Sequence, residues 1–132
     1  MASHAKGTFQ VTNWEENAYD EIGDGAKLTR ARITQDFKGD FEGTGSWESL
    51  MCYSRDGTAV YLGLARLTGR LGGREGGIVL RTEGVFDGNE ARTTWSVVPG
   101  AGTDGLQGLS GEGTSVAPHG PNGTYTLDYE LD

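Results

Sequence analysis

Residues 56–98 read DGTAVYLGLARLTGRLGGREGGIVLRTEGVFDGNEARTTWSVV, and this stretch decides the fold. Three residue pairs, Asp56-Gly57, Gly72-Gly73 and Asp87-Gly88, divide it into shorter runs. Such pairs tolerate the positive φ angles of tight hairpin turns. Within the runs, apolar and polar residues alternate with the period of a half-buried strand. The stretch therefore predicts three successive hairpins, an antiparallel meander.

The same alternation continues on both sides of the meander. Strands are expected within 7–14, 27–38 and 40–55 before it, and within 111–116 and 124–131 after it. Segment 15–25 is acidic and ends in glycine, so it predicts a loop.

Two further features lie near the C-terminal end. Asn122-Gly123 predicts another tight turn. Thr103 is expected to cap one short helical turn near 103–109, which carries Leu106 and Leu109. No other segment shows the pattern of a long helix.

About eight strands joined by short hairpins, with no helix to cover a sheet face, leave a sandwich or a barrel. A barrel is favoured because closure removes the exposed strand edges that invite aggregation. Eight strands also enclose room for packed side chains or for one small ligand. We predict an all-β fold, a closed antiparallel barrel that occupies residues 1–132 as a single domain.

Composition and charge exclude several classes of partner. Lys and Arg total 11 against 19 Asp and Glu, a net charge of -8, which would repel nucleic-acid phosphates. No apolar run approaches the roughly 20 residues that span a bilayer. We expect a cytoplasmic protein, because the opening residues lack the apolar stretch of a secretory signal and Cys52 stands alone. One cysteine and two histidines make a metal site improbable, and no cofactor is expected.

Several blocks resemble one known family. They are GDFEGTG at 39–45, LGL at 62–64, LGGR at 71–74, WSVVPG at 95–100, APHG at 117–120 and YTLDY at 125–129. In order and spacing they resemble a bacterial domain of unknown function, family 3224, which implies an allene-oxide-cyclase-like barrel. The glycine-rich run 100–113 likewise resembles a segment shared by allene oxide cyclases and dirigent proteins. The resemblance implies a fold and a habit of binding small apolar molecules, and no particular reaction.

Three residues are candidates for catalysis, each with a plainer alternative. His119 lies in a rigid turn near a barrel mouth and could act as a general base, or it could bond to nearby backbone. Glu48 and Glu83 would be desolvated acids of raised pKa if their strand faces line the lumen. On the outer face they would be ordinary solvated surface residues.

Ligand contacts are expected from the aromatic residues of the inward strand faces. Trp47, Tyr53, Tyr61 and Trp95 share those faces with smaller residues, so a cleft is predicted beside the two tryptophans. Arg30 either closes the lumen against a carboxylate ligand or lies on a solvated face in a salt bridge.

These observations predict a protein that binds a small hydrophobic molecule in the barrel lumen. The alternative is a cofactor-free isomerase or cyclase, whose lumen would fold a flexible apolar substrate. Both need an apolar pocket with few polar groups, so the sequence leaves open whether the protein is an enzyme. We also expect self-association into a homo-oligomer.

Overall fold

Nine strands account for most of residues 3–118 and 122–131, the parts of the chain that the computed structural model describes. Their bounds are β1 Ser3–Gly23, β2 Ala26–Gly39, β3 Phe41–Tyr53, β4 Ala59–Leu71, β5 Arg74–Phe86, β6 Glu90–Val97, β7 Thr103–Asp104, β8 Ser110–Pro118 and β9 Asn122–Glu130. No helix occurs within these described ranges, and so none that could cross a membrane.

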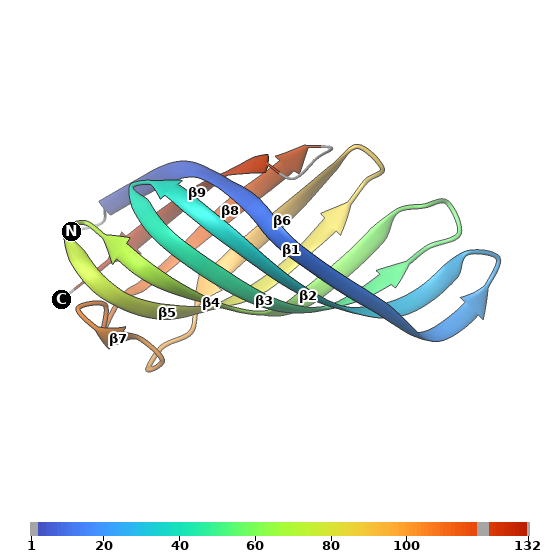
Figure 1. The fold of residues 1–132 in the computed structure, drawn as a ribbon, viewed down its shortest axis with the longest axis horizontal. Helices are drawn as coiled ribbons and strands as arrows, with labels where there is room; N and C mark the ends of the chain where they lie inside the picture. The colour runs from blue at the N-terminus through green and yellow to red at the C-terminus, as the bar shows by residue number, and fades with distance from the viewer. Residues whose placement is uncertain (1–2, 119–121, 132) are drawn as a thin grey trace.

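Eight of these strands close into an antiparallel barrel (Figure 1). Neighbouring strands pair in the order β4, β3, β2, β1, β9, β8, β6, β5, and β4 also pairs with β5, which completes the circle. The short β7 pairs with Gly76 and Gly77 of β5 as an extra strand. The prediction of a closed barrel of about eight strands is confirmed.

The meander forms as predicted, with turns at all three glycine-containing pairs. Gly72 and Gly73, for example, join β4 to β5 with φ angles of 60° and 80°. Such angles are the left-handed conformation that a two-residue hairpin turn requires. The predicted turns of the meander are therefore confirmed, and each depends only on the residues at the turn itself.

Two of the predicted loops and turns are wrong. Segment 15–25 is no loop, because β1 continues to Gly23 and forms a long hairpin with β2. Asn122-Gly123 is no turn, because both residues begin β9 and pair with β1. A side chain at Gly123 would meet the ring of Phe9 at 2.3 Å, so this glycine makes room for an aromatic neighbour.

The segment around 103–109 lies beside β5 at one end of the barrel (Figure 1). Backbone bonds from Leu106 N to Thr103 O, 3.0 Å, and from Leu109 N to Leu106 O, 3.3 Å, make successive turns in place of the expected helical turn. Leu106 and Leu109 are buried in the hydrophobic core. This end is thus closed by packed side chains, and the opposite end carries the β1–β2, β3–β4 and β5–β6 hairpins.

Aromatic rings fill the middle of the barrel. Phe37 makes edge contacts with Phe41, Trp95 and Tyr125, and Trp95 stacks on Tyr125 with ring centroids 6.0 Å apart. The Tyr125 hydroxyl accepts a bond of 2.9 Å from the backbone N–H of Phe41. This packed centre forms the floor beneath the open end.

Candidate ligand-binding site

A cavity of about 340 Å³ lies inside the barrel toward the hairpin end. Most of its walls are apolar or aromatic, and none of the described residues that line it carries a formal charge. The lining residues are Phe9, Val11, Trp14, Ile33, Gln35, Trp47, Ser49, Met51, Tyr53, Ala59, Tyr61, Phe86, Ala91, Thr93, Ser115, Ala117 and Pro118. A cavity of this size and lining is at the small end of the range for sites that hold small organic molecules.

The structure brings three of the four predicted aromatic contacts to this cavity. Trp47, Tyr53 and Tyr61 line it. Trp95 is not among the lining residues, since its ring packs in the core with its centroid 6.0 Å from that of Trp47. Trp95 therefore supports Trp47 from below, and its predicted role as a direct ligand contact does not fit its position.

A β-bulge adds a wall that the sequence pattern did not reveal. The pairing of β1 with β2 shifts between Val11 and Asn13. Before the shift Phe9 lies opposite the inward Phe37, and after it Trp14 lies opposite the inward Ile33. An extra residue reverses the alternation of the strand. Trp14, Glu16 and Ala18 thus take the inner face near the mouth, as far as a second shift between Ala18 and Asp20.

Glu16 is the centre of a hydrogen-bonded cluster at the mouth. Its carboxylate accepts bonds from Thr29 Oγ1 at 2.6 Å, Tyr53 Oη at 2.6 Å and Trp14 Nε1 at 2.9 Å. Burial opposes ionisation, but the three donors outweigh it and lower the pKa of Glu16. Burial and the adjacent carboxylate raise the pKa of Tyr53. A charged Glu16 therefore holds two cavity residues, Trp14 and Tyr53, in place.

Several polar atoms inside the barrel have no hydrogen-bond partner. Gln35 Oε1 and Trp47 Nε1 belong to buried residues of the cavity wall, and Thr82 Oγ1 and Trp95 Nε1 lie in the buried interior. Most buried polar groups in native proteins are bonded, and leaving one unbonded costs about 1–3 kcal/mol. Unpartnered atoms in the wall of a cavity are therefore available to the polar group of a ligand.

The predicted ionisable residues lie elsewhere. Arg30 and Glu48 are on the outer face, where Glu48 accepts bonds from Arg30 Nε at 3.1 Å and Arg32 Nε at 2.8 Å. The bonds from Arg32 and Arg30 lower the pKa of Glu48, the reverse of the shift expected in a lumen. Of the two alternatives for Arg30 and Glu48, the structure shows the solvated outer face, because adjacent residues of a strand face opposite ways and Trp47 takes the inner face. His119 lies outside the described residues.

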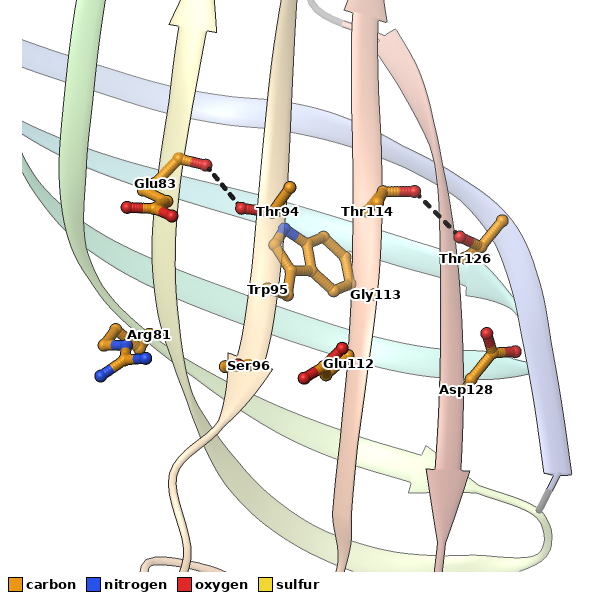
Figure 2. Close-up of a pocket in the computed structure, with 10 residues that line it drawn as sticks. All are labelled: Arg81, Glu83, Thr94, Trp95, Ser96, Glu112, Gly113, Thr114, Thr126 and Asp128. Atoms are coloured by element: carbon orange, nitrogen blue, oxygen red, sulfur yellow. Dashed lines mark hydrogen bonds between the residues drawn. The ribbon is translucent and has the colours of Figure 1, made fainter.

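Glu83 is exposed on the polar side of the outer surface (Figure 2). A hollow of about 400 Å³ there is lined by Arg81, Glu83, Trp95, Gly113 and the outer residues of β6, β8 and β9. Figure 2 shows hydrogen bonds from Thr94 Oγ1 to Glu83 O, 3.3 Å, and between the hydroxyls of Thr114 and Thr126, 3.0 Å. Glu83 thus takes the second of its two alternatives, the solvated outer face.

The described residues contain no cluster of three metal-binding side chains.

A closed eight-stranded barrel with an uncharged cavity beneath one mouth defines a class of small β-barrel proteins with an interior site of ligand size. Within that class the chain belongs to the DUF3224 family, described as proteins of unknown function, whose profile matches residues 5–129. A search of curated proteins found no match.

A solved structure of similar fold supports the barrel assignment. It is the crystal structure of a protein of unknown function from the DUF3224 family of Shewanella oneidensis MR-1. The two chains share 24% sequence identity, superpose with a TM-score of 0.78, and match over 100% of this chain and 99% of the other. At this level of identity the likeness shows the fold alone.

Proposed function

We propose that the protein binds a small, largely apolar molecule in the cavity at the barrel mouth. The observation that carries this proposal is an apolar cavity of about 340 Å³ whose wall includes two buried polar side chains with an unpartnered atom, Gln35 and Trp47. A protein interior is otherwise packed without such voids. The apolar part of a ligand would fill this void and contact its walls. One polar group on the ligand would form a hydrogen bond with Gln35 or Trp47.

The unpartnered atoms of the wall indicate which polar group the ligand carries. Trp47 Nε1 can only donate a hydrogen bond, and Gln35 Oε1 can only accept one. A hydroxyl group both donates and accepts, so a compact alcohol or phenol matches either atom. The ligand is therefore expected to be uncharged, with one hydroxyl or a similar group on a hydrocarbon or aromatic frame.

The wall favours binding over the isomerase or cyclase alternative. Stabilising charge in a transition state needs preorganised charged or strongly polar groups at the reacting atoms. The ionisable groups in the described wall are the phenols of Tyr53 and Tyr61, and burial raises the pKa of both. They stay neutral at ordinary pH, so the cavity offers recognition more readily than acid–base chemistry.

Titration with N-phenyl-1-naphthylamine, an uncharged apolar dye, tests the proposal. We expect saturable dye fluorescence and quenching of the tryptophan emission, since Trp14 and Trp47 line the cavity. Trp47→Phe should remove more of the quenching than Trp95→Phe, because Trp95 lies below the cavity.

A matched pair of variants on β8 locates the bound dye. Ala117→Phe places a ring in the cavity and should lower dye affinity at least about tenfold. Val116→Phe is the control, because this neighbour points to the outer face opposite Arg92 and Thr124. Equal affinity in the two variants, or an absence of saturable binding in the unmodified protein, would contradict a site in the barrel mouth.

A further inference from the structure

An apolar patch covers part of the outside of the barrel. Large hydrophobic side chains of β3, β4 and β5 are about half exposed there, with Leu62 the most exposed at 59%. The patch residues are Leu28, Leu50, Cys52, Val60, Leu62 and Val85, and beside Tyr19 they border a hollow of about 520 Å³. A contiguous apolar surface of this kind on a small protein marks an interaction site more often than a solvated face.

The strand register arranges the patch in rows across four strands. One row holds Arg30, Leu50, Leu62 and Glu83 in that order from β2 to β5. The row therefore has an apolar centre, with Arg30, which also bonds Glu48 of the next row, at one end and the carboxylate of Glu83 at the other. Continued around the barrel, the same row meets Thr94, Thr114 and Thr126 on the polar side shown in Figure 2. The apolar character thus belongs to one side of the barrel.

We propose that this patch is the contact surface of a symmetric homodimer. A two-fold axis parallel to the strands, between β3 and β4, exchanges the two ends of each row. It places Arg30 against Glu83 of the partner subunit, and Leu50 against the partner's Leu62. A closed dimer needs such a self-complementary surface, and opposite charges at the two ends of one row provide it.

The neighbouring row supports the same arrangement. Leu28, Cys52, Val60 and Val85 lie side by side on the four strands, and the two-fold axis places Leu28 against the partner's Val85. Every contact in that row joins apolar side chains. The two rows together form an apolar centre, and one of them has a charged residue at each end. Protein interfaces have this composition, an apolar core within a polar rim.

The surface area of the chain is consistent with a partner. The isolated chain exposes 7704 Å². A folded monomer of 14.0 kDa is expected to expose about 6,700 Å², so the excess is roughly 1,000 Å². A standard interface removes about 800 Å² from each partner. A dimer contact of ordinary size would thus bring the exposed surface of each chain back to the usual value.

Sedimentation velocity over a concentration series tests the dimer. The unmodified protein should sediment with twice the 14.0 kDa chain mass. Leu62→Glu should raise the dimer dissociation constant at least about 100-fold, because it buries a charge in the apolar centre of the contact. Thr114→Glu, a new carboxylate on the polar side, is the control and should leave the dimer unchanged. Circular dichroism checks that both variants keep the barrel fold.

Charge exchange tests the direction of the axis. Glu83→Arg places two arginines opposite each other and should weaken the dimer about tenfold or more. Adding Arg30→Glu to the same chain restores opposite charges and should recover most of the affinity. A monomer at every concentration, a dimer indifferent to Leu62→Glu, or a double variant weaker than Glu83→Arg would overturn the proposal. Because the patch lies outside the barrel, these results do not depend on the cavity binding a ligand.

Discussion

Replacing Thr82 with valine tests whether unpartnered polar atoms inside the barrel cost stability. Thr82 is 1% exposed, lies between Gly63 and Trp95 on the neighbouring strands, and has no hydrogen-bond partner for Oγ1. Valine keeps the branched shape and replaces the hydroxyl with a methyl group. The substitution therefore removes a buried polar group with little change in packing.

The size and sign of the effect follow from two contributions. An unsatisfied buried hydroxyl costs about 1–3 kcal/mol, and a newly buried methyl group contributes about 0.8 kcal/mol. We expect Thr82→Val to raise the free energy of unfolding by about 2 kcal/mol. Thr93→Val is the matched control, because Thr93 Oγ1 lies 2.7 Å from Tyr61 Oη in a hydrogen bond. Loss of that bond, about 1 kcal/mol, offsets the gain from the methyl group.

Urea unfolding followed by tryptophan fluorescence measures both variants. Thr82→Val should shift the midpoint to higher urea without a change in slope, and raise Tm by about 6–8 °C. Thr93→Val should unfold near the unmodified protein or slightly below it. If Thr82→Val proves the less stable of the two, the reasoning is refuted, and a bound water is the partner of the hydroxyl.

Three other predictions concern single contacts. Tyr125→Phe should lower the free energy of unfolding by about 2 kcal/mol, because the buried N–H of Phe41 loses its acceptor, and an unchanged urea midpoint would contradict this. Glu16 has a lowered pKa in the folded protein, so it stabilises the fold above its ordinary value of 4.5, and this stabilisation is lost as the pH falls through the lowered value. Glu16→Gln should flatten that part of the curve of urea midpoint against pH, and a slope equal to that of the unmodified protein would count against it. Gly63→Ala would place Cβ 1.9 Å from the carbonyl oxygen of Glu48, so we expect a loss of more than about 3 kcal/mol, and a normal yield and midpoint would disprove the close approach.

Local patterns were sufficient for the meander and for most of its inward face. The turns at 56–57, 72–73 and 87–88 need only residues that accept positive φ, a property of the chain at that point. The strands between these turns have no bulges. The alternation of inward and outward residues therefore assigned Tyr61 and Trp95 correctly to the interior. A closed barrel of about eight strands followed from the number of strands and the lack of helices.

The choice between opposite faces needed the tertiary structure. Trp47 and Glu48 are neighbours on β3, so both could not face the lumen, and the sequence supported a role for each. Closure of the barrel buries Trp47 and leaves Glu48 outside with Arg30 and Arg32, since moving an ionised carboxylate out of water costs far more than leaving it there. The same closure placed Trp95 below the cavity and not in its wall, a difference of depth that alternation does not encode.

The part of the site built by β1 was beyond any pattern in the sequence. Residues 15–23 looked like an acidic loop because bulges break the alternation that identifies a strand. A bulge depends on pairing with a partner strand, and here it turns Trp14 and Glu16 toward the mouth. Turns and strand periods are set by neighbours along the chain, so the amino-acid sequence determined them directly. The residues that meet in the cavity are set by register and closure between distant strands, and only the folded barrel decided them.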